Sequence, residues 1–507
     1  MRQTPKIAVI GGGIGGLAAA AILSRDFEVH IFEADDQVGG KIRQTRVGDG
    51  HIDCGPTVFT MRWVFDDLFE RAGSSFETAV AAKPLEVLAR HGWQDQSQLD
   101  LFADVEASVA AIAEFSSAAE GERYRAFCHK TEAIFETLHH SFMRNANPNM
   151  AGLMARAGPF DLLATQPFTK LWDYLSRQFK DPRLQQLFAR YSTYCGSSPY
   201  EAPATLMLIA HVERVGVWTL DGGMRALVDA LILLLERNGA EIHVNAPVTK
   251  IETEGGTARR IHLGDGSVFD ADAIVFNGDR AALASGLLGK DAVKAGGNAL
   301  RMQRSQSAIT WCIEAETSGF DLSVHNVFFS DAYKEEFDAV FHEGRVPDTP
   351  TTYIFAPDRD GKTLDRNQTE RLFCLINAPA KEQRGTFSDD LVERAYDRMG
   401  ELLVRCGLNL RPVGSSIAPT SPDVFAQRFP ATNGALYGMA THGWHASFAR
   451  PVTRSRVPGL YLAGGSVHPG PGVPMAALSG MAAADAIKKD LPAQRARRAS
   501  AASETVT

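Results

Sequence analysis

The chain has 507 residues and a formal net charge of −8 at pH 7. This acidic balance argues against nucleic-acid binding, because contacts to phosphates need a basic surface. The six cysteines are scattered without a C-x-x-C pair, so the sequence indicates neither a disulfide framework nor a metal site. No apolar run reaches the roughly 18 residues of a membrane-spanning helix, and the length allows two or more domains.

The chain begins with a pattern typical of a dinucleotide-binding βαβ unit. An apolar strand over 6–10 runs into Gly11-Gly-Gly-Ile-Gly-Gly16, an Ala-rich helix is expected over 17–23, and a second apolar strand ends on Glu33. The glycines follow a strand, open a helix and precede an acidic residue at about the spacing of the ribose contact. This context makes the motif specific, and we predict an α/β, Rossmann-type nucleotide-binding domain.

The glycines of this motif have separate physical tasks. Gly11 would make the tight turn, Gly13 would let the backbone approach the pyrophosphate, and Gly16 would let the helix pack closely on the strand. The phosphates would lie at the helix N-terminus, where unpaired N–H groups and the helix dipole favour negative charge. Taken singly, each glycine could instead be a turn residue without a ligand contact.

Two features favour FAD over a nicotinamide cofactor. Glu33 would accept hydrogen bonds from ribose hydroxyls and would repel the extra phosphate of NADP. Gly39-Gly40-Lys41 marks a second close approach of the backbone to a bulky group, which is unusual at this place in a nicotinamide dehydrogenase. The first strand starts so close to the N-terminus that no signal peptide is expected.

The nucleotide-binding pattern returns in the middle of the chain. Strands are expected over 238–245, 247–253 and 271–276, the last with the apolar character of a parallel sheet. A helix over 224–237 precedes them and would cover the sheet. A nucleotide-binding domain that is discontinuous in sequence is therefore predicted.

The nucleotide-binding pattern occurs again near the C-terminus. A strand at 459–463 runs into Gly464-Gly-Ser466, followed by a Pro-Gly loop and a small-residue helix over 476–487. Pro474 suits a first helical turn, where its missing N–H costs nothing. The N-terminus of that helix could direct its dipole at a flavin, where negative charge accumulates on reduction.

Two insertions separate these pieces and are expected to form an α+β substrate domain. The first has short strands near 85–89 and 99–102 and then helices over 105–143 and 160–195, and the second mixes strands with a helix over 388–406. The predicted division is a FAD-binding domain over 1–76, 219–279 and 416–490, a substrate and membrane-docking domain over 77–218 and 280–415, and a disordered tail over 491–507.

The longest motifs resemble the flavin-dependent carotenoid desaturases of the bacterial phytoene desaturase type, within the amine-oxidase-like flavoproteins. The resemblance spans nearly the whole chain and is most specific in Asp53-Cys-Gly-Pro-Thr57, Leu220-Asp-Gly-Gly-Met224 and the segment 461–474. Residues 55–61 and 464–468 are most similar to the 1-hydroxycarotenoid 3,4-desaturases, also called methoxyneurosporene dehydrogenases. The resemblance implies a Rossmann-type FAD-binding domain with an inserted α+β domain.

The resemblance implies FAD-dependent desaturation of an acyclic carotenoid, most closely C-3,4 desaturation of a 1-hydroxy- or 1-methoxycarotenoid. Flavin N5 would take a hydride from an allylic carbon, and loss of a neighbouring proton would complete the double bond. A quinone or oxygen would be the electron acceptor. The alternatives are a phytoene desaturase-type enzyme, an amine or porphyrinogen oxidase of the same flavoprotein group, and a non-catalytic flavin-containing carrier.

The resemblance also places the cofactor on residues of this chain. Gly13, Gly15 and Gly16 would hold the pyrophosphate. Lys41 stands where the family more often has Arg, so a point charge replaces a bidentate phosphate contact. The complete set of implied cofactor-binding residues is Gly11, Gly13, Ile14, Gly15, Gly16, Glu33, Ala34, Gly39, Gly40, Lys41, Gly55, Pro56, Thr57, Val248, Gly464, Gly465, Ser466, Val473 and Met475.

Few polar residues suggest themselves as catalytic. His468 lies in the flavin-proximal motif and is the candidate catalytic residue, with ordering of the Pro-Gly loop as the alternative. His139 and His140 with Arg144 lie in the helical insertion, where a surface position is the simpler reading. Asp53 could contact the flavin or hold a turn.

A carotenoid dissolves in the bilayer, so the resemblance implies a cytoplasmic protein peripherally attached to the inner membrane. The candidate docking patch is 153–170, and basic residues over 488–498 could add attraction to anionic lipid. The apolar side chains over 160–175 suit either a helical core or the walls of a substrate tunnel, because periodicity cannot separate the two.

Overall fold

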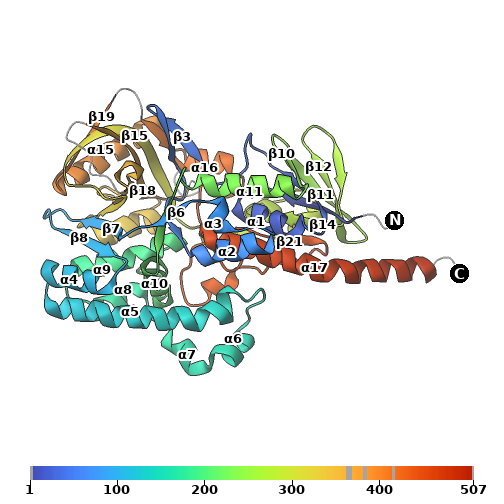
Figure 1. Cartoon of the computed structure of the whole chain (residues 1–507), viewed down its shortest axis with the longest axis horizontal. Helices are drawn as coiled ribbons and strands as arrows, with labels where there is room; N and C mark the ends of the chain where they lie inside the picture. The colour runs from blue at the N-terminus through green and yellow to red at the C-terminus, as the bar shows by residue number, and fades with distance from the viewer. Residues whose placement is uncertain (1–3, 361–367, 381–384, 414–416, 505–507) are drawn as a thin grey trace.

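The computed structural model describes residues 4–360, 368–380, 385–413 and 417–504. Figure 1 shows two parts side by side along the long axis of the molecule. A parallel sheet with its helices lies on the right, where both termini are found, and a mixed sheet with a layer of helices below it lies on the left.

The described residues form a five-stranded parallel sheet in the order β10-β2-β1-β14-β21. Its strands come from the three segments that the sequence assigns to nucleotide binding. The division into domains remains a prediction, and its boundary at 415/416 lies outside the described residues. The strands are β1 (Lys6–Ile10), β2 (Glu28–Phe32), β10 (Glu241–His243), β14 (Ala273–Phe276) and β21 (Leu460–Leu462).

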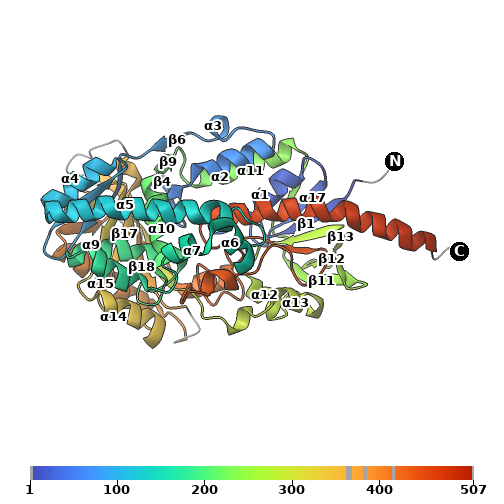
Figure 2. The same cartoon turned by 90° about the horizontal axis from the view of Figure 1, so that it is seen from below.

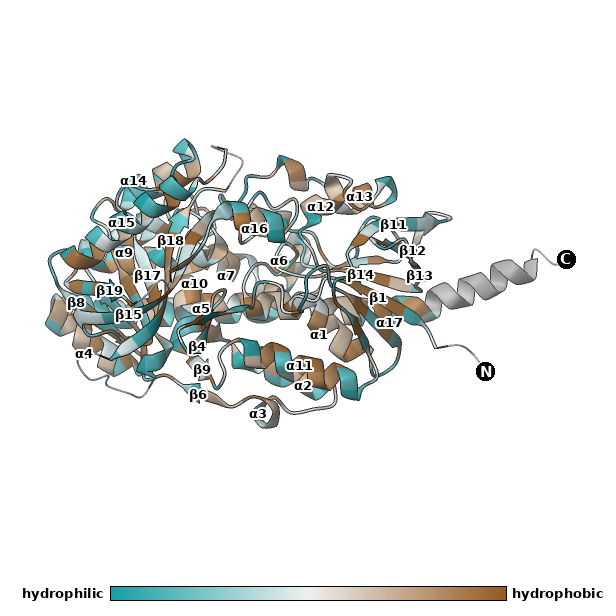
Figure 3. Cartoon of the chain, turned by 90° about the horizontal axis from the view of Figure 1, so that it is seen from above, coloured by the Kyte–Doolittle hydropathy of each residue, from teal (hydrophilic) through white to brown (hydrophobic). Residues whose placement is uncertain are grey.

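Alternate residues of β1 explain how this sheet is buried on both faces. Ile7 and Val9 join one apolar cluster with α1 (Ile14–Leu23), and Ala8 and Ile10 join another on the opposite face. The first cluster also contains residues of α11 (Arg225–Arg237) and α17 (Val473–Glu504). In Figure 3, apolar residues dominate β1 and β14.

The strand expected over 247–253 is not part of the parallel sheet. It forms β11 (Val248–Glu254), which pairs antiparallel with β12 (Thr257–Leu263), and β12 pairs with β13 (Val268–Asp270) in a separate sheet. The physical reason is visible in the burial pattern. β11 buries Ile251 between exposed or half-exposed neighbours, whereas every residue of β14 is buried, as a central parallel strand requires.

Strands from both insertions join in one mixed sheet, in the order β19-β15-β18-β17-β16-β7-β8 with β20 paired to β15. Helix α15 (Asp389–Arg405) packs Val392, Met399 and Leu402 against one face of this sheet. The strands are β7 (Val87–Gly92), β8 (Gln98–Phe102), β15 (Ser307–Gly319), β16 (His325–Phe328), β17 (Thr352–Phe355), β18 (Thr369–Ala378), β19 (Leu408–Pro412) and β20 (Ala418–Thr420).

A helical layer lies below the mixed sheet in Figure 1, and α6 (Met150–Ala157) and α7 (Pro159–Ala164) protrude beneath it. The view from below in Figure 2 places both beside the end of α5 (Ala118–Leu138). The layer also contains α4 (Val105–Phe115), a π-helical turn (His139–Met143), α8 (Leu171–Gln178), α9 (Pro182–Ala189), a 3₁₀ turn (Arg190–Cys195) and α10 (Leu208–Arg214).

Shorter elements connect the two parts of the molecule. Among the described residues, no helix is both long and apolar enough to cross a bilayer. The connecting elements are β3 (Gln44–Val47), β4 (Gly50–Asp53), β5 (Phe59–Thr60), α2 (Arg62–Arg71), α3 (Phe76–Ala79), β6 (Ala82–Pro84), β9 (Val217–Leu220), α12 (Arg280–Ala284), α13 (Val293–Gly296), α14 (Tyr333–Asp338) and α16 (Pro422–Arg428).

The C-terminal helix is longer than the sequence predicts. α17 begins at Val473 and its backbone stays helical to Glu504, so the prediction of a disordered tail over 491–507 is wrong for 491–504. Residues 505–507 lie outside the described residues. Alanine and arginine dominate this stretch, and their high helix propensity does not depend on an apolar face.

Candidate active site

The turn after β1 brings the first glycine motif against Glu33 and the 39–40 loop. The Glu33 carboxylate accepts a hydrogen bond from the Gly12 N–H at 2.7 Å, and the Gly39 N–H donates to the Gly12 carbonyl at 2.8 Å. A Cβ on Gly40 would lie 3.0 Å from the Cα of Gly13. Gly11 has φ of +95° and Gly39 of +128°, values that favour glycine.

This arrangement fits the pyrophosphate of a dinucleotide. No side chain caps the N-terminus of α1, where Gly13 is the N-cap residue, so its first N–H groups are available to an anion. A Cβ on Gly13 would come within 2.8 Å of Asn277 Nδ2. A Cβ on Gly16 would come within 2.3 Å of the Gly11 carbonyl oxygen, as expected for close packing of helix on turn.

The second glycine motif meets the first. Gly464, with φ of +104°, donates its N–H to Ser479 Oγ at 2.7 Å, and a Cβ on Gly15 would lie 2.8 Å from the Gly464 nitrogen. A Cβ on Gly480 would lie 2.0 Å from the Gly15 carbonyl oxygen, so α1 and α17 pack through glycine. We call residues 11–16, 39–41 and 464–466 the glycine cradle.

The adenosine end of the cradle is marked by Glu33. Besides Gly12, the Glu33 carboxylate accepts a hydrogen bond from the Asp35 N–H at 3.0 Å. The Glu33 carbonyl accepts from the Ala246 N–H at 2.8 Å, so the segment that leads to Val248 passes directly beside it. Ala34 follows Glu33 and is exposed. The structure thus brings together the residues that the resemblance implies for ribose and adenine.

Lys41 connects the cradle to the segment 427–438. Its Nζ donates to the Leu436 carbonyl and lies 5.3 Å from the centre of the Phe429 ring. The side chain is accessible to solvent but surrounded by protein, and desolvation lowers the pKa of Lys41 to about 8, although Asp279 opposes this shift. The ammonium group therefore loses its proton more easily than that of an ordinary lysine.

Three further residues bond to the cradle and an ion pair lies beside them, and none of these five residues was identified from the sequence. Asn277 Nδ2 donates to the Gly11 carbonyl at 3.2 Å, and Arg450 donates to the Gly465 carbonyl at 3.1 Å. Burial lowers the pKa of Arg450 to about 10. The Arg280 N–H donates to Ser466 Oγ at 3.4 Å, and Asp279 pairs with Arg304 beside it. Asn277 and Asp279 follow the buried strand β14, the usual place of ligand residues in a parallel sheet, which could have identified them.

An apolar cavity of about 570 Å³ opens beside the cradle. Gly55, Pro56 and Thr57 line it, as do Val473 and Met475, so it reaches the residues implied to lie near the flavin ring. Most of its other lining side chains are apolar and come from the helical layer and the mixed sheet. They include Leu138, Phe142, Met143, Leu162, Leu206, Leu208, Ile209, Val212, Val327, Phe337, Phe373 and Leu375.

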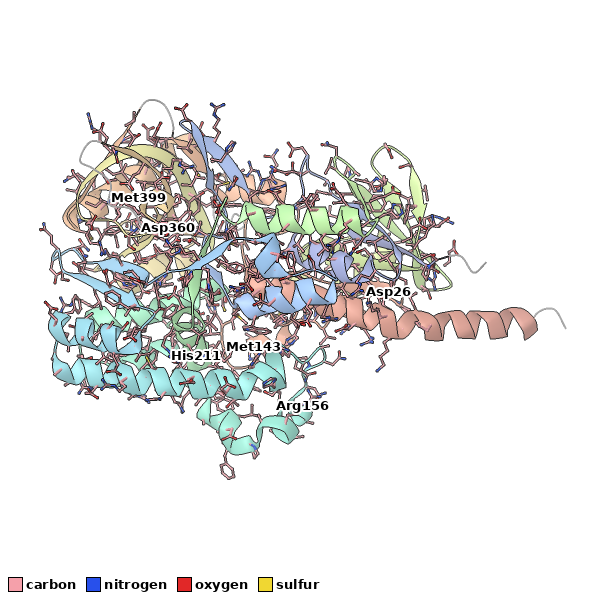
Figure 4. The ribbon with its side chains drawn as sticks, in the orientation of Figure 1. Asp26, Met143, Arg156, His211, Asp360 and Met399 are labelled. Atoms are coloured by element: carbon pink, nitrogen blue, oxygen red, sulfur yellow. The ribbon has the colours of Figure 1, made fainter. Side chains whose placement is uncertain are left out.

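The mouth of the cavity is formed by exposed apolar side chains, which we call the apolar rim. Phe168 is 67% exposed and its ring lies 5.5 Å from that of Trp444. Phe160, at 84% exposure, lies next to the mouth on α7 without lining the cavity. Figure 4 places the labelled Arg156 on the same protruding lobe. The rim consists of Met154, Phe160, Leu163, Phe168, Trp444 and Phe448.

The structure also shows which apolar residues over 160–175 line the cavity and which belong to the core. Phe168 lines the cavity, whereas Leu171 and Leu175 are fully buried in the main core. Trp172 and Tyr174 pack against that core from its edge. The stretch therefore contains both tunnel wall and ordinary helical core.

His468 is buried beside the cavity but does not line it. Its Nε2 lies 3.0 Å from the Phe142 carbonyl oxygen, and its ring packs edge-on against Phe142 at 4.6 Å between ring centres. Burial lowers the pKa of His468 to about 4. These contacts support the ordering of the Pro-Gly loop, and a direct catalytic role remains a prediction.

The other polar candidates lie away from the cavity. His139 is half-buried and accepts from Arg144 Nε at 3.2 Å, and His140 is exposed. Asp53 accepts hydrogen bonds from the Met224 N–H at 2.8 Å and from Gln44 at 3.0 Å, which is the turn-holding role. The exposure of His140 fits a surface position, and the contacts of Asp53 are those of a residue that holds a turn.

One group of metal-type ligands occurs among the described residues, at the edge of the parallel sheet. It consists of His30, Glu241 and His243. The 3.1 Å separation of His30 Nδ1 and His243 Nε2 fits a hydrogen bond between two imidazoles. His30 is more than 200 residues away from Glu241 and His243 in sequence, so ligand spacing did not indicate the group.

Comparison with known proteins agrees with this geometry. Residues 14–295 match the family described as flavin containing amine oxidoreductase. The chain is 44% identical to the hydroxyneurosporene desaturase of Rubrivivax gelatinosus, over 98% of this chain and 96% of that protein. It is 42% identical to the hydroxyneurosporene desaturase of Cereibacter sphaeroides, over 98% and 100%.

A solved structure confirms the fold class. An oxidoreductase from Methanosarcina mazei matches with a TM-score of 0.62 at 19% identity, over 94% of this chain and 99% of that chain. The similarity to the Rubrivivax and Cereibacter proteins confirms the resemblance seen in the motifs. The chain belongs to the carotenoid desaturase family of the flavin-containing amine oxidoreductases.

Proposed function

We propose that the protein catalyses the FAD-dependent C-3,4 desaturation of an acyclic 1-hydroxycarotenoid or 1-methoxycarotenoid in carotenoid biosynthesis. The observation that carries this proposal is the junction between the glycine cradle and the apolar cavity, where Gly55 to Thr57 and Met475 line the cavity wall. A cavity with mostly apolar walls suits a polyene. The 44% identity to a hydroxyneurosporene desaturase points to the same substrate class.

FAD is the cofactor that the cradle would hold. When bound, it supplies the two-electron oxidation of a carbon–carbon single bond, chemistry that protein side chains lack. The backbone of Gly13, Gly15 and Gly16 would hold the pyrophosphate, Glu33 the ribose, and Val248 the adenine. Gly464, Gly465, Ser466, Val473 and Met475 would lie along the ribityl chain and the ring, opposite Gly55, Pro56 and Thr57.

The remaining task of the chain is to exclude water and align the substrate. Apolar side chains on all sides of the cavity keep the reacting carbons in a medium of low polarity. No histidine is among the lining residues in the described part of the chain. A proton lost from the substrate would therefore be accepted by one of the few polar lining groups or by the reduced cofactor.

The apolar rim would dock on a membrane surface. Six large apolar side chains, exposed by 37–84%, form the rim, and three of them lie on α6 and α7, which protrude in Figure 1. A solvated patch of this kind marks an interaction site, and a substrate dissolved in lipid would enter without crossing water. Lys488 forms an ion pair with Asp26 at 2.7 Å, which weakens the expected contribution of the C-terminal basic residues.

We infer a location on the cytoplasmic face of the inner membrane, with a quinone or oxygen as electron acceptor. A bilayer surface would bring both the carotenoid and a quinone to the same rim. The alternatives are a phytoene desaturase-type enzyme, an amine or porphyrinogen oxidase, and a non-catalytic carrier. The mostly apolar cavity disfavours a small soluble amine, because the carboxylate that lines it in the described part of the chain, Glu213, already faces Arg190 and would not compensate the desolvation of a second cation.

The proposal is tested by product analysis. The FAD-loaded protein is incubated with a quinone and liposomes that carry an acyclic 1-hydroxycarotenoid, and the extracted pigment is analysed by mass and absorbance. We expect a product two hydrogens lighter with a longer chromophore. Parallel incubations contain phytoene or an aliphatic amine, and turnover of one of these instead of the hydroxycarotenoid would replace the proposal with that alternative.

A further inference from the structure

A cluster of polar side chains is buried in the wall of the otherwise apolar cavity. We call Arg190, Tyr194 and Glu213 the buried polar cluster, and all three line the cavity. Arg190 is 6% exposed and Glu213 is 3% exposed. The 3₁₀ turn after α9 supplies the first two residues and α10 supplies the third. No sequence motif groups these three residues.

The hydrogen bonds within this cluster are well defined. Arg190 Nη1 donates to the Tyr194 hydroxyl at 2.9 Å, and that hydroxyl donates to Glu213 Oε1 at 3.0 Å. Tyr191 donates to the other carboxylate oxygen. Burial raises the pKa of Tyr194 well above its ordinary value, so the phenol stays protonated and remains a donor.

The cluster nevertheless leaves hydrogen-bonding capacity unused. Arg190 Nε and Nη2 are buried and have no hydrogen-bond partner among the described residues, and Nη2 lies 3.7 Å from Glu213 Oε2. Buried polar groups are almost always paired, because leaving one unpaired costs free energy. Arg190 lines the cavity, so a guanidinium group with two nitrogens that make no hydrogen bond to the described residues points to a ligand that carries a polar atom.

A second polar group lines the cavity on its expected flavin side, at Thr57 and Tyr353. Thr57 Oγ1 lies 2.7 Å from the Tyr353 hydroxyl, and His325 Nδ1 lies 2.8 Å from the same hydroxyl. Burial, together with the nearby Glu213, raises the pKa of Tyr353, although Thr57 and Arg190 oppose the shift. The cluster and Thr57 therefore lie within electrostatic reach of one another in one cavity.

We propose that Arg190, Tyr194 and Glu213 form the binding site for the 1-hydroxyl group of the substrate. The hydroxyl oxygen would accept a hydrogen bond from Arg190 Nη2, and its proton would be donated to the cluster at Glu213 or Tyr194. The inference rests on the proposed function and names the group that determines substrate specificity. No residue of the cluster has to take part in bond breaking.

The position of the cluster suits the chemistry of a 1-hydroxycarotenoid. The C-3,4 bond lies only a few bonds from the hydroxyl carbon, so a hydroxyl site near Thr57 would fix which carbon–carbon bond faces the flavin ring. The rest of the polyene would extend through the apolar cavity toward the rim. A carotenoid without the hydroxyl would leave the guanidinium edge unpaired, and sites built to bind a hydroxyl reject such analogues strongly.

The test compares two substrates that differ only in the hydroxyl group. We would measure kcat/KM for the 1-hydroxycarotenoid and for the same carotenoid with hydrogen at that position, in the FAD-loaded enzyme with liposomes. The wild type is expected to prefer the hydroxylated substrate by about 100-fold or more. The 1-methoxy ether, which accepts but cannot donate, is expected to fall between the two.

The variants are chosen to keep the cavity folded. The double variant Arg190→Gln/Glu213→Gln preserves the net charge and size of the cluster, and Tyr194→Phe removes a single hydroxyl. In both, the preference is expected to fall by about tenfold or more through a lower kcat/KM for the hydroxylated substrate alone. Tyr124→Phe is the control, because Tyr124 is a buried tyrosine of α5 that does not line the cavity.

The outcomes separate this inference from the proposed function. A wild type that desaturates both carotenoids equally would overturn the hydroxyl site and leave the desaturase standing. Loss of activity toward both substrates in equal measure, with unchanged flavin content and partition of carotenoid from vesicles to protein, would assign the cluster a structural role. A wild type that desaturates neither substrate would overturn the proposed function and the inference with it.

Discussion

The glycine cradle and the apolar cavity are built in opposite ways. The cradle is built from backbone, in which Gly13 meets Gly40 and Gly15 meets Gly464 at distances that exclude side chains. The cavity is a structure of side chains that come from residues between Gly55 and Met475. A site built from backbone has a recognisable local sequence pattern, because only glycine fits its close contacts. A site built from common apolar side chains has almost no such pattern.

The most direct test of the cradle as a cofactor site is a substitution that places a side chain in it. In Gly13→Val the added Cβ would lie 2.8 Å from Asn277 Nδ2 and the branched side chain would occupy the space where the pyrophosphate approaches. We expect flavin content below about a tenth of the wild-type value, since close backbone approach is the task of this glycine. The ratio of flavin to protein absorbance measures it.

The matched control for this variant is Gly400→Val. Gly400 lies in α15 and an added Cβ would meet nothing within 4 Å. Its flavin content should equal that of the wild type. Full flavin occupancy in Gly13→Val would remove the first glycine motif from the cofactor site.

Among the residues that line the cavity, substitution of the buried charged ones should cost the most folding free energy. Glu213→Leu would leave the Arg190 guanidinium buried without its carboxylate partner, and such a loss costs about 3–5 kcal/mol of folding free energy. The exposed pair of Arg394 and Asp390 offers the comparison, since Asp390→Ala should cost less than about 1 kcal/mol. Denaturant unfolding of both variants measures the difference, and equal losses would show that Arg190 is not held by Glu213.

The free energy of unfolding should fall in acid because of His468, which lies near the junction between the cradle and the cavity. Its folded-state pKa of about 4 lies below the ordinary value near 6.5, so the unfolded state binds the extra proton between these pH values. Stability from this group is complete above pH 6.5 and is lost toward pH 4, at about 1.4 kcal/mol per pH unit. His91 and His325, whose pKa values burial lowers to about 3, act in the same direction.

The variant His468→Gln isolates this contribution. Its unfolding free energy should decline less steeply between pH 6.5 and 4 than that of the wild type, whereas His140→Gln, at an exposed position, should keep the wild-type slope. Denaturant unfolding at a series of pH values gives both slopes. Identical slopes in His468→Gln and the wild type would mean that this imidazole is not held neutral.

The apolar rim should control access from the membrane without affecting the cradle. Phe160 is 84% exposed, and burial of a phenyl group in lipid contributes about 1.5–3 kcal/mol, so Phe160→Ser should weaken vesicle binding by about tenfold to a hundredfold. Vesicle flotation measures the partition.

The control for the rim is Leu233→Ser. Leu233 is 67% exposed on α11, on the side of the molecule away from the lobe in Figure 1, and its loss should leave vesicle binding unchanged. Equal effects of the two variants would indicate non-specific adhesion instead of docking by the rim.

The same contrast explains what could be predicted from sequence. The parallel sheet, the cradle and the family followed from local glycine motifs, and the short strands expected near 85–89 and 99–102 correspond to β7 and β8. The strand at 247–253 was predicted, but its hairpin with β12 was not recognised, although β12 follows it directly in sequence. The end of α17 was missed because helix propensity outweighed the lack of an apolar face.

The site residues divide in the same way. Glu33 and the glycines were found because their spacing is fixed by covalent geometry within one βαβ unit. Arg190, Glu213 and Arg450 were not found, because an isolated charged residue in a helical segment reads as solvent-exposed until the fold buries it. His468 was found as part of a motif, and only its contacts with Phe142 indicate its structural role.

The central claim is that the cradle and the cavity together oxidise a hydroxycarotenoid. The most direct measurement is anaerobic mixing of the FAD-loaded protein with a liposome-borne acyclic 1-hydroxycarotenoid while the flavin absorbance is followed. We expect the flavin to bleach in proportion to the pigment converted, because no other acceptor is present. A flavin that stays oxidised while the pigment is bound and unchanged would contradict the claim and leave a carotenoid carrier.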